Sequence, residues 1–160
     1  MLDAYHYVQK NGLIREVEYS PYVARQRRCD DTNGKERVYV ADMIEEDEVT
    51  NDRLKELLSV QPVGVAMYSN PSCLGSYSSG IVTESECSCS AENREVNHAV
   101  TVVGYGISDR PDCQGYWLIK NSWGPYWGES GFFRLCSDKT DETPHGICWV
   151  NSFVQYPIAK

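Results

Sequence analysis

The sequence predicts an α+β fold in which a small helical part precedes a larger, mainly antiparallel β part. Apolar residues recur with helical spacing only in the first 60 residues. The last third instead holds four apolar runs bounded by Gly, Pro, Asp or Ser, which is typical of short strands joined by turns. These runs cover residues 97–106, 116–123, 131–136 and 147–156.

Two helices are expected in the first part. Residues 1–11 can form an amphipathic helix with Gly12 as its C-cap, and Asn51 or Thr50 can cap a second helix over residues 51–60. The segment between them is rich in turn signals over residues 13–36, so we expect it to be irregular.

A strand is expected directly after the second helix. Pro62 ends that helix, and the apolar run that follows it predicts a strand over residues 62–68. Ser, Gly and Cys dominate the stretch from Ser69 to Arg94, which predicts a long loop.

The overall charge and hydropathy exclude two kinds of partner. The formal net charge of −8 argues against nucleic acid, because phosphate binding requires clustered Lys and Arg. The short basic run 25–28 is followed at once by Asp30 and Asp31, which favours a solvated loop. No apolar run is long enough to span a bilayer, so no membrane contact is expected, and the first residues do not have the pattern of a signal peptide.

The seven cysteines indicate disulfides in an oxidising compartment. No Cys-x-x-Cys pair is matched by a second one, so we expect no metal site. Because seven is odd, one cysteine needs a partner from elsewhere.

Two polar blocks interrupt the apolar runs of the last third, and they contain His98 and Asn121. If these residues lie at adjacent ends of neighbouring strands, the amide oxygen can accept a hydrogen bond from the imidazole and fix its tautomer. An amide orients an imidazolium without neutralising it, which suits a thiol nucleophile. Trp123 could cover the pair from water. Taken alone, a His that starts a strand and an Asn before a turn are more often structural, and the residues by themselves leave that alternative open.

The blocks VNHAVTVVGYG (96–106) and YWLIKNSWGPYWGESGFFRL (116–135) resemble the His and Asn segments of papain-like cysteine proteases of the cathepsin L-like branch. The resemblance extends over residues 4–29, 51–68 and 152–158, and therefore over essentially the whole chain. It implies a papain-like fold, with a remnant of the helical left-hand domain over residues 1–50. The right-hand β-barrel-like domain would cover residues 51–160 and carry His98 and Asn121.

The resemblance also implies roles for individual residues. His98 would be the catalytic base and acid, Asn121 would orient it, and Trp123 would shield the pair. Phe153 is bulkier than the small residue common at its position, which bears on the breadth of the main specificity pocket. The residues expected beside the substrate are Ala66, Asn97, Ala99 and Phe153.

The same resemblance implies a cysteine pairing. Cys89 would pair with Cys148, and the family partner of Cys29 would lie upstream. The pairing of the remaining four, which could form two further bridges, stays open: Cys73, Cys87, Cys113 and Cys136.

The family's nucleophile lies in a segment resembling Gln-x-x-x-Cys-Gly-x-Cys-Trp, and nothing in this sequence matches it. We therefore expect a portion of a cysteine-type endopeptidase that is inactive alone, acts on peptide or protein substrates, needs no cofactor, and has the missing N-terminal segment as a partner. The alternative is a truncated, non-catalytic homologue that acts as a binding or regulatory protein. The resemblance and the cysteines imply a lysosomal, vacuolar or extracellular location.

Overall fold

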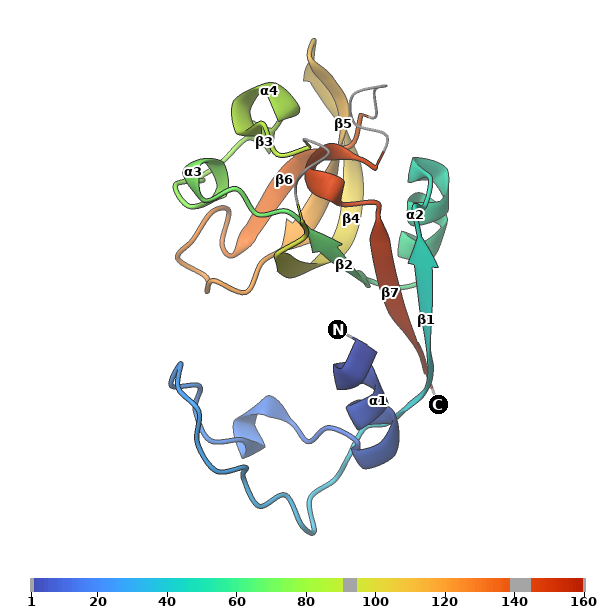
Figure 1. Cartoon of the computed structure of the whole chain (residues 1–160), viewed down its shortest axis with the longest axis vertical. Coiled ribbons are helices and arrows are strands. Elements are labelled where there is room, and N and C mark those ends of the chain that lie inside the picture. The colour runs from blue at the N-terminus through green and yellow to red at the C-terminus, as the bar shows by residue number, and fades with distance from the viewer. Residues whose placement is uncertain (1, 91–94, 139–144, 160) are drawn as a thin grey trace. The chain divides into compact units, whose positions relative to one another are not determined.

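The computed structural model describes residues 2–90, 95–138 and 145–159. The chain divides into two compact units, Met1–Ile44 with Pro157–Lys160, and Glu45–Tyr156. Figure 1 labels the helices and strands of both.

The first unit begins with the predicted helix, α1 (Leu2–Asn11). The helix ends at Gly12, whose φ of +70° suits glycine and whose N–H donates to the carbonyl oxygen of Val8 at 2.8 Å. Leu13 and Val38 then form an antiparallel bridge that closes the unit. Apart from the short 3-10 turn η1 (Glu16–Glu18), the segment between them is irregular, as predicted.

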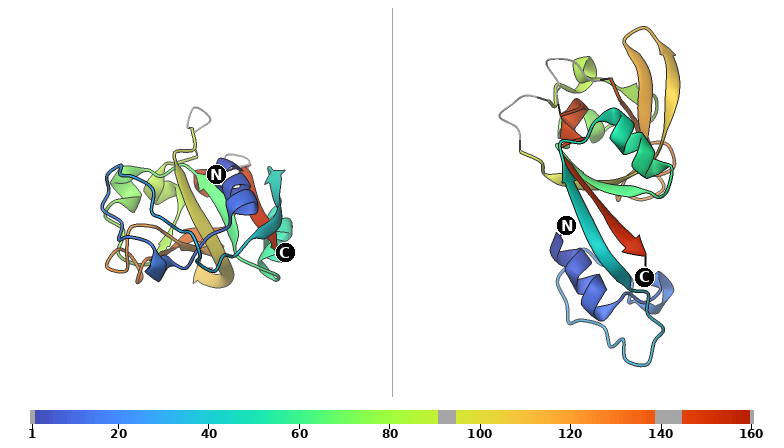
Figure 2. Two further views of the ribbon diagram at one scale, coloured as in Figure 1. Left: turned by 90° about the horizontal axis from the view of Figure 1, so that it is seen from below. Right: turned by 90° about the vertical axis from the view of Figure 1, so that its right-hand side faces the viewer.

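The second unit is built on the sheet. The strands of the sheet are β1 (Val40–Asp47), β2 (Val63–Met67), β3 (Ile81–Val82), β4 (His98–Arg110), β5 (Cys113–Lys120), β6 (Phe132–Cys136) and β7 (Phe153–Ala159). The first part of β1 and the last part of β7 belong to the first unit. Among the described residues the strand order is β1-β7-β2-β4-β5-β6-β3. The right-hand view of Figure 2 shows β1 and β7, the neighbours at one edge, side by side.

The predicted second helix, α2 (Asn51–Leu58), packs on this sheet. Thr50 is its N-cap, and its hydroxyl accepts a hydrogen bond from the backbone N–H of Arg53 at 3.1 Å. Leu54 is fully buried, and it shares the core with Trp117 of β5 and Phe133 of β6. This core fixes the central strands against one another.

Strand register brings the start of β4 and the end of β5 to the same end of these two central strands. Thr101 of β4 pairs with Lys120 of β5, and Met67 of β2 pairs with His98. The first residue of β4 and Asn121, the residue after β5, therefore lie close together. These strand ends carry the candidate site.

Three features differ from the sequence prediction. β1 was not predicted, because four of its eight residues are acidic and most are exposed, so it lacks the alternating pattern of a half-buried strand. The run 147–156 is not one strand: Ile147–Trp149 form the 3-10 turn η2, with φ of +53° at Cys148, and β7 begins at Phe153.

The third difference lies in the stretch that was predicted to be a loop. Within it lie the short helices α3 (Pro71–Leu74) and α4 (Glu84–Cys87) and the strand β3. β3 pairs with β6 in parallel, so the sheet is mixed and not wholly antiparallel. Residues 91–94 of that stretch lie outside the described part.

Across the described ranges, no helix has both the length and the apolar character that a bilayer-spanning segment requires.

Candidate active site

His98 and Asn121 meet at the adjacent ends of β4 and β5, as predicted from the sequence. The imidazole Nε2 lies 2.8 Å from the amide Oδ1 of Asn121. Asn121 is buried, and its backbone N–H donates to the carbonyl oxygen of Gly131 at 2.9 Å. The amide is therefore held in place from the protein side, while the ring remains partly exposed.

The hydrogen bonds around the amide fix the tautomer of the ring. The backbone N–H of Ser122 donates to the same Oδ1 at 2.8 Å, which identifies this atom of Asn121 as the oxygen. An amide oxygen can only accept, so Nε2 of His98 must carry the proton that it shares with Asn121. The other ring nitrogen, Nδ1, is left to exchange a proton with a reacting group.

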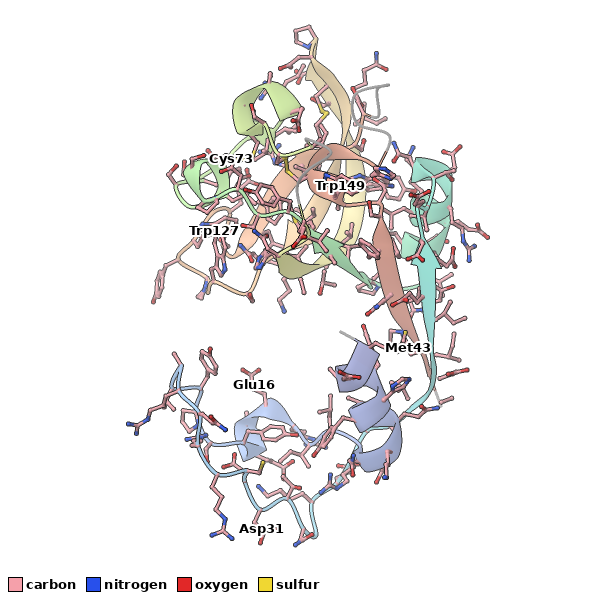
Figure 3. All side chains as sticks on the ribbon, viewed as in Figure 1. Glu16, Asp31, Met43, Cys73, Trp127 and Trp149 are labelled. Atoms are coloured by element: carbon pink, nitrogen blue, oxygen red, sulfur yellow. A yellow bond between two sulfur atoms is a disulfide. The ribbon has the colours of Figure 1, made fainter. Side chains whose placement is uncertain are left out.

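Trp123 covers the imidazole. Its ring lies 5.2 Å from that of His98 at an interplanar angle of 35°. Trp127 packs edge-on against Trp123 at 4.9 Å, and its indole N–H donates to the carbonyl oxygen of Leu74 at 3.0 Å. Figure 3 labels Trp127 beside α3, the helix that ends at Leu74. Trp123 therefore screens one side of the pair. Because its own side chain remains 42% exposed, the site stays open to solvent.

An ion pair anchors the loop that carries the two tryptophans. Glu129 accepts three hydrogen bonds from Arg134 of β6, the shortest at 2.6 Å, and one from the backbone N–H of Gly80 at 3.0 Å. The Arg134 guanidinium holds the pKa of the Glu129 carboxyl below its usual value, so the carboxylate stays charged and the loop stays fixed.

Sequence reasoning assigned no role to Trp127 or to this ion pair. The spacing of four residues between Trp123 and Trp127, which brackets a Gly-Pro turn, is the signal that could have pointed to Trp127.

The sequence also did not reveal that the amide nitrogen of Asn121 is buried without a hydrogen-bond partner among the described residues. An unsatisfied buried donor costs about 1–3 kcal/mol and calls for an explanation, such as a role at a functional site.

Three of the four predicted substrate-binding residues form one row across the sheet, and the fourth lies directly before β4. Ala99 of β4 pairs with Ala66 of β2, and Ala66 pairs with Phe153 of β7, so the three side chains share one face of the sheet. Asn97 lies one residue before β4. Its backbone N–H donates to the carbonyl oxygen of Met67, and its side-chain oxygen accepts from the N–H of Ser69.

Six of the seven cysteines are in disulfides. Cys89 is bonded to Cys148, the pairing that the family resemblance implied, and Cys29 is free and exposed. The four cysteines whose pairing the sequence left open form two bridges, Cys73–Cys87 and Cys113–Cys136. The cysteines that lie close together in the described residues are therefore bonded as disulfides, and a sulfur in a disulfide cannot act as a thiolate ligand for a metal.

Solved structures define the class of this fold as papain-like. The bromelain protease from Ananas comosus, in complex with the E64 inhibitor, superimposes with a TM-score of 0.81 at 30% identity, covering 98% of this chain and 68% of that one. A cysteine protease of Carica candamarcensis in complex with E-64 gives a TM-score of 0.77 at 28% identity, covering 98% and 67%.

The chain belongs to the papain family cysteine proteases, whose family model matches residues 1–158. It is 35% identical to zingipain-2 of Zingiber officinale over 160 residues, which is all of this chain and 67% of that protein. It is 33% identical to cathepsin L2 of Homo sapiens over 171 residues, covering 98% of this chain and 45% of the relative. The chain thus spans less than half of one of these relatives and about two thirds of the other.

Proposed function

We propose that this chain is the part of a cysteine-type endopeptidase that supplies the base and its orienting amide. The contact of 2.8 Å between His98 Nε2 and Asn121 Oδ1 carries the proposal. It leaves Nδ1 of His98 to take the proton of a thiol and later to give it to the leaving amine. The thiolate would attack the peptide carbonyl, and water would hydrolyse the resulting acyl-enzyme.

The amide of Asn121 supports a thiol nucleophile in particular. A carboxylate in its place would neutralise a protonated ring, whereas an amide leaves the positive charge of His98 available to a thiolate. Trp123 lies over the ring and limits access of water to the hydrogen bond, which strengthens it. The site is built to hold an imidazolium in a defined direction.

The nucleophile is proposed to lie outside this chain. Six of the seven cysteines are in disulfides, so Cys29 is the one free thiol. Cys29 lies in an irregular segment, preceded by arginines and followed by Asp30, and not at the start of a helix. Helix N-termini are among the sites that activate catalytic thiols. We infer that an upstream segment supplies the reacting cysteine and that the 160 residues alone are inactive.

The substrate is proposed to be a peptide or protein. The row of Ala99, Ala66 and Phe153 offers an apolar surface that begins at the residue after His98, and half-exposed Phe153 would narrow the pocket for the substrate side chain. Because the N–H of Asn97 is already used by Met67, a substrate contact through the Asn97 backbone would use its carbonyl oxygen. The three disulfides favour an oxidising compartment, so we place the protein in the lysosomal, vacuolar or extracellular route.

The lack of a second free thiol beside Cys29 favours one other candidate function, a non-catalytic homologue that binds peptides or a protease. The test compares the 160-residue chain with a longer product of the same gene that includes the upstream sequence. Both are assayed for hydrolysis of a fluorogenic peptide and for labelling by a thiol-directed active-site reagent, after near-ultraviolet circular dichroism has shown that both are folded.

We expect hydrolysis and labelling from the longer protein alone. Hydrolysis by the 160 residues alone would show that the nucleophile is within them and would contradict the proposal. A longer protein that is folded, reacts with neither substrate nor label, and still binds peptide would establish the non-catalytic function instead.

A further inference from the structure

The basic run 25–28 is not used by the proposed protease site. It consists of Arg25, Gln26, Arg27 and Arg28, and all four residues are exposed. They lie in a stretch, residues 20–31, without helix or strand and without backbone-to-backbone hydrogen bonds to the rest of the described chain. Figure 3 labels Asp31 at the end of this stretch in the first unit. Among the described residues, the peptide groups of residues 21–29 have no hydrogen-bond partner and are therefore free to pair with another protein.

The ends of this loop are held together. Asp30 accepts two hydrogen bonds from Ser20, one from the backbone N–H and one from the hydroxyl, each at 2.7 Å. The arginines between them are thus presented on a loop whose base is closed. Exposed loops of this kind are the preferred sites of proteolytic cleavage in folded proteins.

Two of the three guanidinium groups are unengaged. Arg27 lies 4.0 Å from the carboxylate of Asp30, a weak ion pair. Within the described ranges, no ion pair or hydrogen bond engages the side chains of Arg25 and Arg28. Their charged forks remain available to carboxylates of a partner, which guanidinium groups bind bidentately.

We propose that the bond between Arg28 and Cys29 is a processing site for an endoprotease that recognises arginine at the first, second and fourth positions before the cleaved bond. An irregular segment with unpaired peptide groups can add to the cleft of such an enzyme as an extra strand. Water is added across the amide, which leaves a carboxylate on Arg28 and a new amino group on Cys29. This inference does not depend on the proposed peptidase activity of the chain.

A polyanion is the other ligand that three arginines could bind, and the surroundings disfavour it. Asp30 and Asp31 follow the run directly, and the chain as a whole carries a net charge of −8. Both features repel a polyanion, whereas an endoprotease reads only the few residues that enter its cleft.

The product of cleavage stays assembled as two chains. Leu13 and Val38 lie on opposite sides of the cut and exchange two backbone hydrogen bonds of 2.8 Å. The guanidinium of Arg37 donates to the carbonyl oxygen of Asn11 at 2.7 Å, and the Lys35 ammonium donates to that of Glu18 at 2.7 Å. These contacts join residues before the cut to residues after it.

The test treats the folded 160-residue chain with furin, a convertase specific for paired basic residues, and follows it by intact mass and N-terminal sequencing. We expect one cut, with a new N-terminus that reads Cys-Asp-Asp, and an unchanged elution volume in native size-exclusion chromatography. Arg25→Gln and Arg28→Gln should each slow the cut at least about tenfold, because each removes a charged contact with the enzyme. Lys10→Gln, at an exposed lysine outside the loop, should be cut at the wild-type rate.

Three results would overturn the proposal. If the Arg25→Gln variant is cut as fast as the wild type, the enzyme does not recognise arginine at the fourth position before the cleaved bond. If the folded chain stays uncut while a free peptide of residues 20–34 is readily cut, the loop in its folded form does not fit the enzyme. An uncut chain that is retained on a heparin column, and loses retention in Arg25→Gln, would identify the run as a polyanion site.

Discussion

Removal of the Cys89–Cys148 bond should destabilise the second unit more than removal of the Cys73–Cys87 bond. A disulfide stabilises in large part by restricting the unfolded chain, and the effect grows with the length of the closed loop. The first bond joins residues 59 apart and the second joins residues 14 apart. The two loops do not overlap, so either disulfide can be removed without changing the length of the loop that the other closes.

The magnitude follows from how the bridges are nested. Cys113–Cys136, whose residues are 23 apart, lies inside the Cys89–Cys148 loop and shortens it to roughly 37 residues of effective length. Chain entropy then gives about 4 kcal/mol for Cys89–Cys148, against about 3 kcal/mol for Cys73–Cys87. Cys89 and Cys148 are fully buried whereas Cys73 is only partly so, and the loss of packing therefore adds to the difference in the same direction.

The assay is urea denaturation at pH 7 of two double variants, Cys89→Ala with Cys148→Ala and Cys73→Ala with Cys87→Ala. Tryptophan fluorescence reports unfolding, and equal slopes against urea would show that the two variants unfold comparably. We expect the first variant to be less stable by about 1 kcal/mol or more. Equal free energies of unfolding, or the reverse order, would refute the reasoning from loop length.

The remaining predictions concern two ion pairs. Glu46 accepts two hydrogen bonds from Arg53, at 2.7 and 2.9 Å, and one from the hydroxyl of Tyr156, which lower its pKa from 4.5 to about 2. Glu46→Gln should lower the free energy of unfolding at pH 7 by about 1–2 kcal/mol after solvent screening. Glu36→Gln should lower it by less than about 0.5 kcal/mol, because the pair of Glu36 with Arg15 is over 70% exposed. Urea denaturation measures both. The folded pKa of Glu46 lies below the unfolded one, so its stabilisation is complete above pH 4.5 and is lost as the pH falls toward 2. An equal cost of Glu46→Gln at pH 7 and pH 2 would contradict this assignment.

Much of the fold could be predicted because the local signals agree with the tertiary structure. The helices α1 and α2 end and begin at the capping residues that the sequence shows, Gly12 and Thr50. The strand β2 alternates between buried and half-buried residues as a strand with one buried face should. The contact of His98 with Asn121 followed from placing two polar blocks at neighbouring strand ends.

The parts that escaped prediction depend on contacts distant in sequence. β1 is a strand because it pairs with β7 at the sheet edge, although its own residues are largely acidic. The turn η2 interrupts an apolar run because Cys148 is tied to Cys89 and its backbone N–H donates to the hydroxyl of Ser90 at 3.0 Å. No local pattern encodes such ties. The support of Trp123 by Trp127 likewise becomes visible only when α3 supplies the acceptor for the second indole.

The most direct test of the central claim is the kcat/KM of His98→Ala in the longer protein that contains the nucleophile. Loss of the ring removes the proton carrier and the counter-charge of the thiolate, so we predict a fall on the order of 10³-fold or more. Asn121→Ala should cost less, about 10- to 100-fold, because the ring loses its direction and not its chemistry. Trp123→Ala should also lower activity, through solvent access alone. A His98→Ala enzyme that is folded and keeps kcat/KM within about threefold of the wild type would contradict the assignment of His98 as the catalytic base.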